Sequence, residues 1–127
     1  MKKILVLSFV LTFCASGLFA ALKKPGVIRE KVSVPSAESV EDAINKACSG
    51  DNWKAVKLNG HNVIFATVDA NECILTAKIT YTKQNYVIEY RESNLDLDDE
   101  DDNAVINSTY DNKIAELNTS ILKNLRG

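Results

Sequence analysis

Beyond the first twenty residues, the side chains that could do covalent chemistry are two of the three cysteines and the single histidine. Cys48 and Cys73 lie on either side of His61 in the sequence. A thiolate beside an imidazole can act as a nucleophile, so a small hydrolase or thiol enzyme that pairs His61 with Cys48 or Cys73 is one hypothesis. The two cysteines are not spaced as CxxC, which argues against a thioredoxin-like redox role.

The same cysteines also permit one disulfide, because an even number of cysteines is typical of small exported domains. A bond between Cys48 and Cys73 would close a loop of about 25 residues and stabilise the domain by on the order of 3 kcal/mol. We expect a bonded or closely packed pair. Two separately buried thiols, packed as small apolar groups, are the alternative.

Carboxylates gather in residues 96–102, where six of the seven side chains are acidic. Alternate side chains in this run form a weak calcium candidate: Asp96, Asp98, Glu100 and Asp102. An EF-hand loop needs Gly at its sixth position and Glu at its twelfth, where this chain has Asp101 and Asn107. We therefore expect a solvated acidic run that favours a helix start, and we predict no cofactor.

The sequence contains no GxSxG, HExxH, P-loop or dinucleotide-binding motif. We therefore expect a non-enzymatic protein that acts by binding an envelope protein or ligand. The formal net charge of −2 gives no indication of a nucleic-acid partner. Recognition is expected through the face of a sheet or through the acidic run.

The first twenty residues predict where the protein works. Two lysines precede an apolar run, residues 4–13, which is too short to span a bilayer. Small residues then lead to a cleavage point after Ala20, which is the order of a secretory signal peptide. We expect export to the periplasm, with an outer-membrane-anchored or extracellular location as the alternatives. No transmembrane span is expected in the mature chain.

Cys14 offers a second interpretation of this leader. A lipid attached to Cys14 would anchor the protein on a membrane without a spanning helix. However, the bulky Phe13 stands where a lipoprotein signal has a small residue. We expect Cys14 to be an ordinary apolar residue that is lost with the leader.

The mature chain is long enough for one small domain, residues 36–127, which follows an extended leader segment at residues 21–35. Helical spacing of apolar residues predicts a short helix over residues 36–50, with Ser39 and Asp42 as a capping pair and Gly50 as a stop. From residue 53 onward, apolar residues recur at every second position. Strands are expected at residues 53–58, 62–68, 73–82 and 86–90, with the first hairpin turn at Asn59 and Gly60.

After the acidic run the helical period returns, and Asp102 or Asn103 could cap the last helix. Its apolar stripe consists of Ile106, Tyr110, Ile114, Leu117, Ile121 and Leu125. We predict an α+β fold: a four-stranded antiparallel meander with an N-terminal and a C-terminal helix packed on one face. That face carries Leu75, Ala77, Ile79, Tyr86, Ile88 and Tyr90, and the solvated face carries Thr76, Lys78, Thr80, Glu89 and Arg91.

Five aromatic residues are expected mainly in the core and not in a binding cleft: Trp53, Tyr81, Tyr86, Tyr90 and Tyr110. Large aromatic side chains supply much of the area that a small domain buries. The parity of the strand positions and the helical spacing of Tyr110 point them toward the predicted core.

Several of these features together are similar to a family of small, uncharacterised bacterial exported proteins, many of them lipoproteins. The features are Gly50 with Trp53, the segment from Tyr86 to Tyr90, the exit Ser93-Asn94-Leu95, and the register of the last helix. The family has His, Asn and Trp in that helix where this chain has Asn107, Asp111 and Lys113. The resemblance implies an envelope location and an α+β fold, and it implies no activity.

Overall fold

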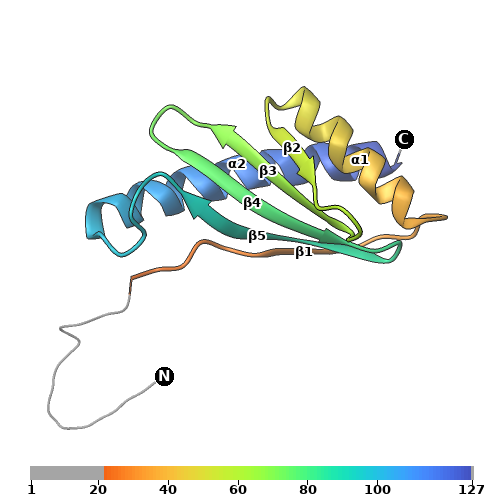
Figure 1. Ribbon diagram of the computed structural model, residues 1–127, viewed down its shortest axis with the longest axis horizontal. Helices are drawn as coiled ribbons and strands as arrows, with labels where there is room; N and C mark the ends of the chain where they lie inside the picture. The colour runs from red at the N-terminus through yellow and green to blue at the C-terminus, as the bar shows by residue number, and fades with distance from the viewer. Residues whose placement is uncertain (1–21, 127) are drawn as a thin grey trace, which may run out of the picture.

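The structure, a computed structural model, describes residues 22–126, which form an antiparallel sheet with two helices (Figure 1). The elements are β1 (Ile28–Lys31), α1 (Ala37–Gly50), β2 (Lys54–Lys57), β3 (Val63–Asp69), β4 (Ile74–Tyr81), β5 (Asn85–Ser93) and α2 (Glu100–Arg126). The sheet order is β1-β5-β4-β3-β2. The predicted α+β class is confirmed, and the four predicted strands are present as β2 to β5.

The predicted number of strands is wrong, because the sheet has five. The additional strand is β1, which lies in the segment expected to be an extended leader, and it pairs antiparallel with β5. Ile28 lies opposite Ile88, and Glu30 lies opposite Tyr86. The four residues of β1 include three charged ones and have a weak strand pattern of their own. They form a strand because the edge of β5 offers unpaired backbone groups with which they can hydrogen-bond.

Both helices begin earlier than their predicted capping residues. Ser36, and not Ser39, caps α1: its backbone is extended and its side chain accepts a hydrogen bond from the Ser39 amide. In the same way, α2 begins at Glu100, and Asp99 accepts a hydrogen bond from the Asp102 amide. The acids of the first turn then lie at the positive end of the helix dipole, which favours this start.

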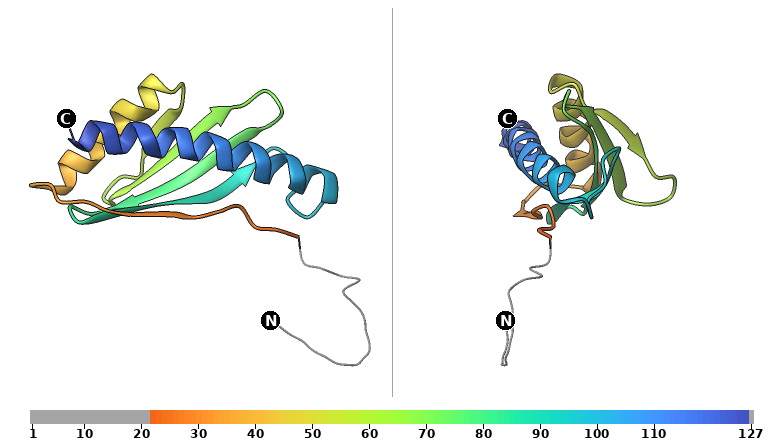
Figure 2. Two further views of the ribbon diagram at one scale, coloured as in Figure 1. Left: turned by 180° about the vertical axis from the view of Figure 1, so that it is seen from behind. Right: turned by 90° about the vertical axis from the view of Figure 1, so that its left-hand side faces the viewer.

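The core lies between the sheet and the two helices, which cover one face of the sheet and contact each other (Figure 2). Buried side chains from α2 are those of the predicted stripe up to residue 121: Ile106, Tyr110, Ile114, Leu117 and Ile121. Leu125 is half-buried. The facing strands bury Leu75, Ala77, Ile79, Tyr86 and Ile88, as predicted, and Tyr90 is half-buried against the core.

The segment that precedes β1 is held against α2 by amide side chains. Asn103 Nδ2 donates to the Lys23 carbonyl at 2.8 Å and to the Leu97 carbonyl at 2.9 Å. Asn107 Nδ2 donates to the same Lys23 carbonyl at 3.0 Å. One turn further, Asp111 Oδ1 accepts a hydrogen bond from the Gly26 amide at 3.4 Å. Thus the start of the described chain is docked on the domain.

The predicted signal peptide at residues 1–20 and the lipidation candidate Cys14 lie outside the described residues. No helix within residues 22–126 is long and apolar enough to cross a membrane.

The packing of α2 on the sheet predicts the effect of truncating a side chain in its stripe. Leu117 is 0 % exposed, so Leu117→Ala should lower the free energy of unfolding by about 2–5 kcal/mol, because it removes buried methyl groups and leaves a cavity. Its exposed neighbour Glu116 is the control, and Glu116→Ala should change that free energy by less than about 0.5 kcal/mol. Urea unfolding measures both. Equal effects would mean that the stripe does not face the core.

A second prediction concerns Glu41 of α1, which accepts a hydrogen bond from the Tyr81 hydroxyl and lies 2.9 Å from Lys57 Nζ. These partners, Tyr81 first, hold the pKa of Glu41 below its ordinary value of 4.5. Because the folded-state pKa is the lower one, this carboxylate stabilises the fold above about pH 4.5 and ceases to do so as the pH falls through the folded-state pKa.

Glu41→Gln should therefore flatten the loss of stability between about pH 5 and pH 3, measured by urea unfolding at several pH values. Glu116→Gln, which changes an exposed carboxylate, should leave that pH profile as it is. If the free energy of unfolding falls equally steeply with pH in Glu41→Gln and in the unchanged protein, the Tyr81 and Lys57 contacts do not favour the ionised form of Glu41.

Candidate functional site

One face of the sheet is covered by the helices, and no described segment covers the other (Figure 2). The predicted solvated face is confirmed, because Thr76, Lys78 and Thr80 alternate with the buried residues of β4. The register places β3 and β5 residues beside them: Phe65 lies opposite Lys78, and Glu89 lies opposite Lys78 on the other side. We call this surface the open sheet face.

An irregularity in the register positions Arg91 on the open sheet face. Thr76 pairs with Glu92 and Ala77 pairs with Tyr90, so Arg91 is an extra residue on β5. Such a bulge re-aims side chains. The Arg91 guanidinium lies 4.4 Å from the centre of the Phe65 ring, which is a cation–π contact. Arg91 therefore covers part of an aromatic ring that would otherwise face solvent.

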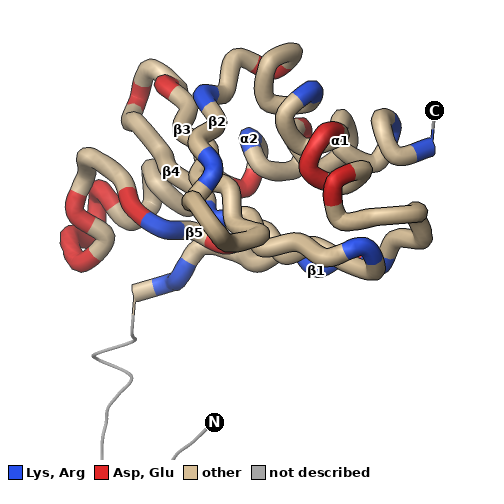
Figure 3. Tube along the Cα trace, turned by 45° about the vertical axis from the view of Figure 1, so that its right-hand side comes forward, with Lys and Arg blue, Asp and Glu red and all other residues tan. Residues whose placement is uncertain are grey.

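Charges are unevenly distributed over the molecule (Figure 3). Among the described residues, alternation and register place five basic side chains on the open sheet face: Arg29, Lys31, Lys54, Lys78 and Arg91. The same face carries three acidic side chains: Asp69, Glu89 and Glu92. The acidic run between β5 and α2 lies at one end of the domain. The open sheet face is thus net basic although the chain is net acidic.

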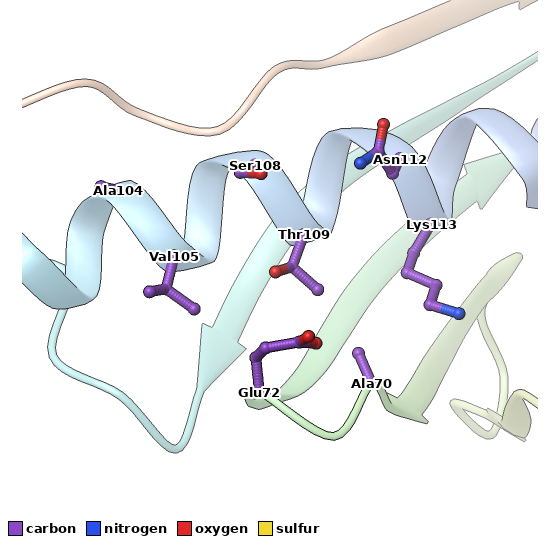
Figure 4. A pocket seen from close by; sticks show the side chains of 8 residues that line it. All are labelled: Ala70, Glu72, Ala104, Val105, Ser108, Thr109, Asn112 and Lys113. Carbon is purple, nitrogen blue, oxygen red and sulfur yellow. The ribbon is translucent and has the colours of Figure 1, made fainter.

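A groove of about 540 Å³ lies between α2 and the turn that joins β3 to β4. The turn is built by short polar contacts: Asp69 Oδ1 accepts from the Asn71 amide at 3.0 Å, and Asn71 adopts a left-handed φ of 74°. Asn tolerates this conformation better than most residues. The turn directs the Glu72 side chain toward α2 (Figure 4).

The other wall of the groove is α2, which contributes Ser108, Thr109, Asn112 and the half-buried Lys113. In Figure 4 Thr109 and Lys113 extend from the helix toward the turn that carries Ala70 and Glu72, whereas Ser108 and Asn112 lie on the side of the helix away from that turn. Within residues 22–126 neither Glu72 nor Lys113 forms an ion pair. The groove therefore presents an unpaired charge of each sign.

The structure has Cys48 and Cys73 as free, buried thiols, so the expected disulfide is not formed in it. Both side chains pack in the apolar core, at 1 % and 2 % exposure. Burial, with a smaller contribution from Asp51, raises the pKa of Cys48 to about 12. Burial also raises the pKa of Cys73, and the Ser93 hydroxyl opposes that shift. Both groups are therefore thiols and not thiolates at neutral pH.

The structure does not bring His61 to either cysteine. His61 is exposed in the turn between β2 and β3, whereas Cys73 precedes Ile74, which pairs with Asp69 at the opposite end of β3. The seven residues of β3 correspond to roughly 20 Å. Cys48 lies at that same far end, since its carbonyl accepts from the Trp53 amide at the start of β2. The cysteine–histidine pair of the enzyme hypothesis is not assembled.

The acidic run uses its carboxylates to hold its own backbone. Asp96 Oδ1 accepts from the Asp98 amide at 2.9 Å, and Asp102 Oδ2 accepts from the Asp96 amide at 3.0 Å. Asp98 and Glu100 are exposed. In the part of the chain that the structure describes, no three His, Cys, Asp or Glu side chains are placed to hold a metal ion. The calcium candidate is therefore not brought together as a site.

The aromatic residues lie mainly in the core, as predicted. Trp53, Tyr81, Tyr86 and Tyr110 are buried. Tyr90 is half-buried, packs edge-on against Tyr110 at 5.5 Å between ring centres, and lines a small cavity of about 180 Å³ beside Pro25. These rings stabilise the fold and do not form an open aromatic cleft.

No protein-family model, curated protein or solved structure matches this chain. The resemblance to small exported bacterial proteins thus stays a prediction from the sequence. The positions where it departs from that family have a role in this structure, because Asn107 and Asp111 both contact the segment before β1.

Glu72 and Lys113 were not among the site residues that the sequence indicated. Nothing in the local pattern links a turn residue to a helix residue so far along the chain. The usable signal is weak: Lys113 directly precedes the buried Ile114, so it lies at the margin of the apolar stripe of α2.

The burial of both thiols predicts their reactivity. In the native protein, a thiol reagent at pH 8 should modify Cys48 and Cys73 at least about tenfold more slowly than after unfolding in guanidinium chloride, because reaction requires local opening. Absorbance of the released thiolate measures both rates. Equal rates in the two conditions would contradict the burial, and failure to react after unfolding would mean that the cysteines are oxidised.

Proposed function

We propose that this protein is a non-enzymatic exported binding protein that uses the open sheet face to bind an acidic surface of another exported protein. The observation that carries the proposal is the one-sided architecture. Both helices lie on the same side of the sheet, which leaves a five-stranded face with a basic excess and one half-buried aromatic side chain, Phe65.

The charges of the open sheet face favour an acidic partner. Basic side chains come from β1, β2, β4 and β5, so the excess extends across the sheet and is not a single cluster. Complementary charge of this kind steers association and selects among partners more than it adds affinity. Binding should therefore weaken as salt is added.

The apolar groups of the same face could supply the contact area at the centre of an interface. Val56 is 56 % exposed and lies opposite Phe65, whose ring is partly covered by Arg91. Aromatic and arginine side chains are the types that most often dominate the binding energy of protein interfaces. Val56 and Phe65 thus form a small apolar patch on β2 and β3 with charged side chains beside it, and protein interfaces commonly combine apolar and charged groups in this way.

Export rests on the leader described from the sequence, with its lysines, short apolar run and small residues before Ala20. A periplasmic location favours a partner in the envelope. The acidic run is the second candidate for recognition, and it would select a basic partner instead.

The test is capture of partners from a native envelope extract by the tagged protein, compared with variants of the two surfaces. Reversing Lys54 and Lys78 to Glu should reduce capture of the bound protein at least tenfold, because both basic side chains then repel an acidic partner. Raising the salt concentration from about 50 mM to about 500 mM should have the same effect.

Two controls make the result specific. Lys123→Glu changes a basic residue near the end of α2, outside the open sheet face, and should leave capture as it is. Neutralising Asp98 and Asp101 to Asn tests the acidic run. Loss of capture only in that acidic-run variant, or binding that both variants retain, would contradict the proposal, provided that circular dichroism shows each variant folded.

A further inference from the structure

We propose that Asn59 is a site of spontaneous covalent modification, in which the backbone nitrogen of Gly60 attacks the Asn59 side chain and converts it to aspartate or isoaspartate. The turn that holds both residues joins β2 to β3 and projects from the sheet away from the helices (Figure 2). The inference does not rest on the proposed function, because the reaction takes place within the turn and needs no partner.

The first argument is the order of the two residues. An asparagine amide can react with the next backbone nitrogen, because a small, unstrained ring then forms. A side chain on the following residue hinders this attack, and glycine has none. Asn59-Gly60 is the only Asn-Gly pair in the chain. Every other asparagine is followed by a larger residue, such as Val63 after Asn62 in the same connection.

The second argument is the space around the pair. Both Asn59 and Gly60 are exposed. Gly60 has a left-handed φ of 79°, and a Cβ built on it would meet no atom within 4 Å, so nothing crowds this residue. The glycine that the turn conformation favours is thus also the residue that leaves the attack unhindered.

The third argument is that the reacting groups are not held by other contacts. The turn is closed by the His61 amide, which donates to the Leu58 carbonyl at 3.2 Å. Among residues 22–126, no hydrogen bond engages the Gly60 amide or the Asn59 side chain. By contrast, the Asn103 side chain is buried and donates to two carbonyl groups. Asn59 can therefore turn toward its neighbour without breaking a contact of the fold.

The reaction balances without an oxidant or reductant. A bond forms between the Gly60 nitrogen and Cγ of Asn59, the bond from Cγ to Nδ2 breaks, and ammonia leaves with the proton lost by the Gly60 nitrogen. Water then opens the resulting succinimide at either of its carbonyl groups. Opening at one carbonyl gives aspartate, whereas opening at the other gives isoaspartate, in which the main chain runs through the former side chain.

The modification changes the connection between β2 and β3 in two ways. Both products add a negative charge to the turn. Isoaspartate also adds a carbon atom to the main chain, and the pairing register of a hairpin depends on the length of its turn. Because β2 lies at the edge of the sheet and pairs with β3 through only four residue pairs, isoaspartate should loosen this strand. The strand carries Lys54 and Val56 of the open sheet face, so this part of the surface should change as the protein ages.

The experiment is incubation of the purified protein in warm, mildly alkaline buffer, followed by proteolytic digestion and mass spectrometry. A synthetic peptide of residues 56–63 is the unstructured reference. The protein fragment that contains Asn59 should gain the mass by which a carboxyl group exceeds an amide, and its two products should separate by chromatography. Asn62 lies in the same fragment and should remain unchanged, because Val63 hinders the equivalent attack.

Matched variants separate the chemistry from its consequences. Asn59→Gln keeps the glycine and a side-chain amide, and should abolish the change, because the larger ring forms far more slowly. Gly60→Ala should slow the change at least about tenfold, because its methyl group hinders the attack. Asn59→Asp adds the charge without lengthening the main chain. Amide hydrogen exchange in β2 should therefore be slow in Asn59→Asp and faster in the isoaspartate fraction of the incubated protein.

The proposal is overturned if Asn59 remains unmodified in the protein after the reference peptide has converted completely, or if another asparagine is modified first. Equal rates in Gly60→Ala and in the unchanged protein would contradict the role of the glycine. Equal hydrogen exchange in the isoaspartate fraction and in Asn59→Asp would contradict the loosening of β2. Circular dichroism shows whether each variant is folded, and Asn59→Gln leaves the glycine of the turn in place.

Discussion

The packing of α2 against the sheet is the interaction on which the rest of this structure depends. The helix extends over 27 residues, about 40 Å, and its buried side chains meet residues from the central strands. A small domain of this size is stable by only about 5–15 kcal/mol, so the apolar area that this one helix buries is a large part of what keeps the strands together. The neighbouring α1 completes the same layer.

This arrangement also accounts for the polarity of the two sides of the sheet. Once both helices occupy one face, strand alternation sends every second side chain to the other, and those side chains must be compatible with water. Threonine, lysine and arginine fill about half of these positions, and Phe65 lies there under the Arg91 guanidinium. The open sheet face is thus a consequence of how the core is built, and its basic excess is the property that distinguishes it from an ordinary solvated surface.

The same helix organises the two features beside the core. Its one margin carries Asn103, Asn107 and Asp111, which hold the start of the described chain. Lys113 lies at its other margin and lines the groove, together with Ser108 and Asn112 on its exposed side. Polar residues at the borders of an apolar stripe are often regarded as solvated positions, yet here they fasten a segment on one side and form a recess on the other. A single helix therefore both holds the segment that precedes β1 and lines the groove.

The sequence by itself determined the local structure. Period-two alternation located β2 to β5, helical spacing located both helices, and the stripe from Ile106 to Ile121 is buried as predicted. Predictions from these patterns are correct because the periodicity of a helix or strand is set by residues that are close in the sequence. Tertiary structure alone decided the fifth strand, since β1 exists through pairing with the edge of β5. It also decided the burial of Cys48 and Cys73, the separation of His61 from both, and the placement of Glu72 and Lys113 along the same groove. These outcomes depend on which distant segments become adjacent, and no local period of hydrophobicity contains that information.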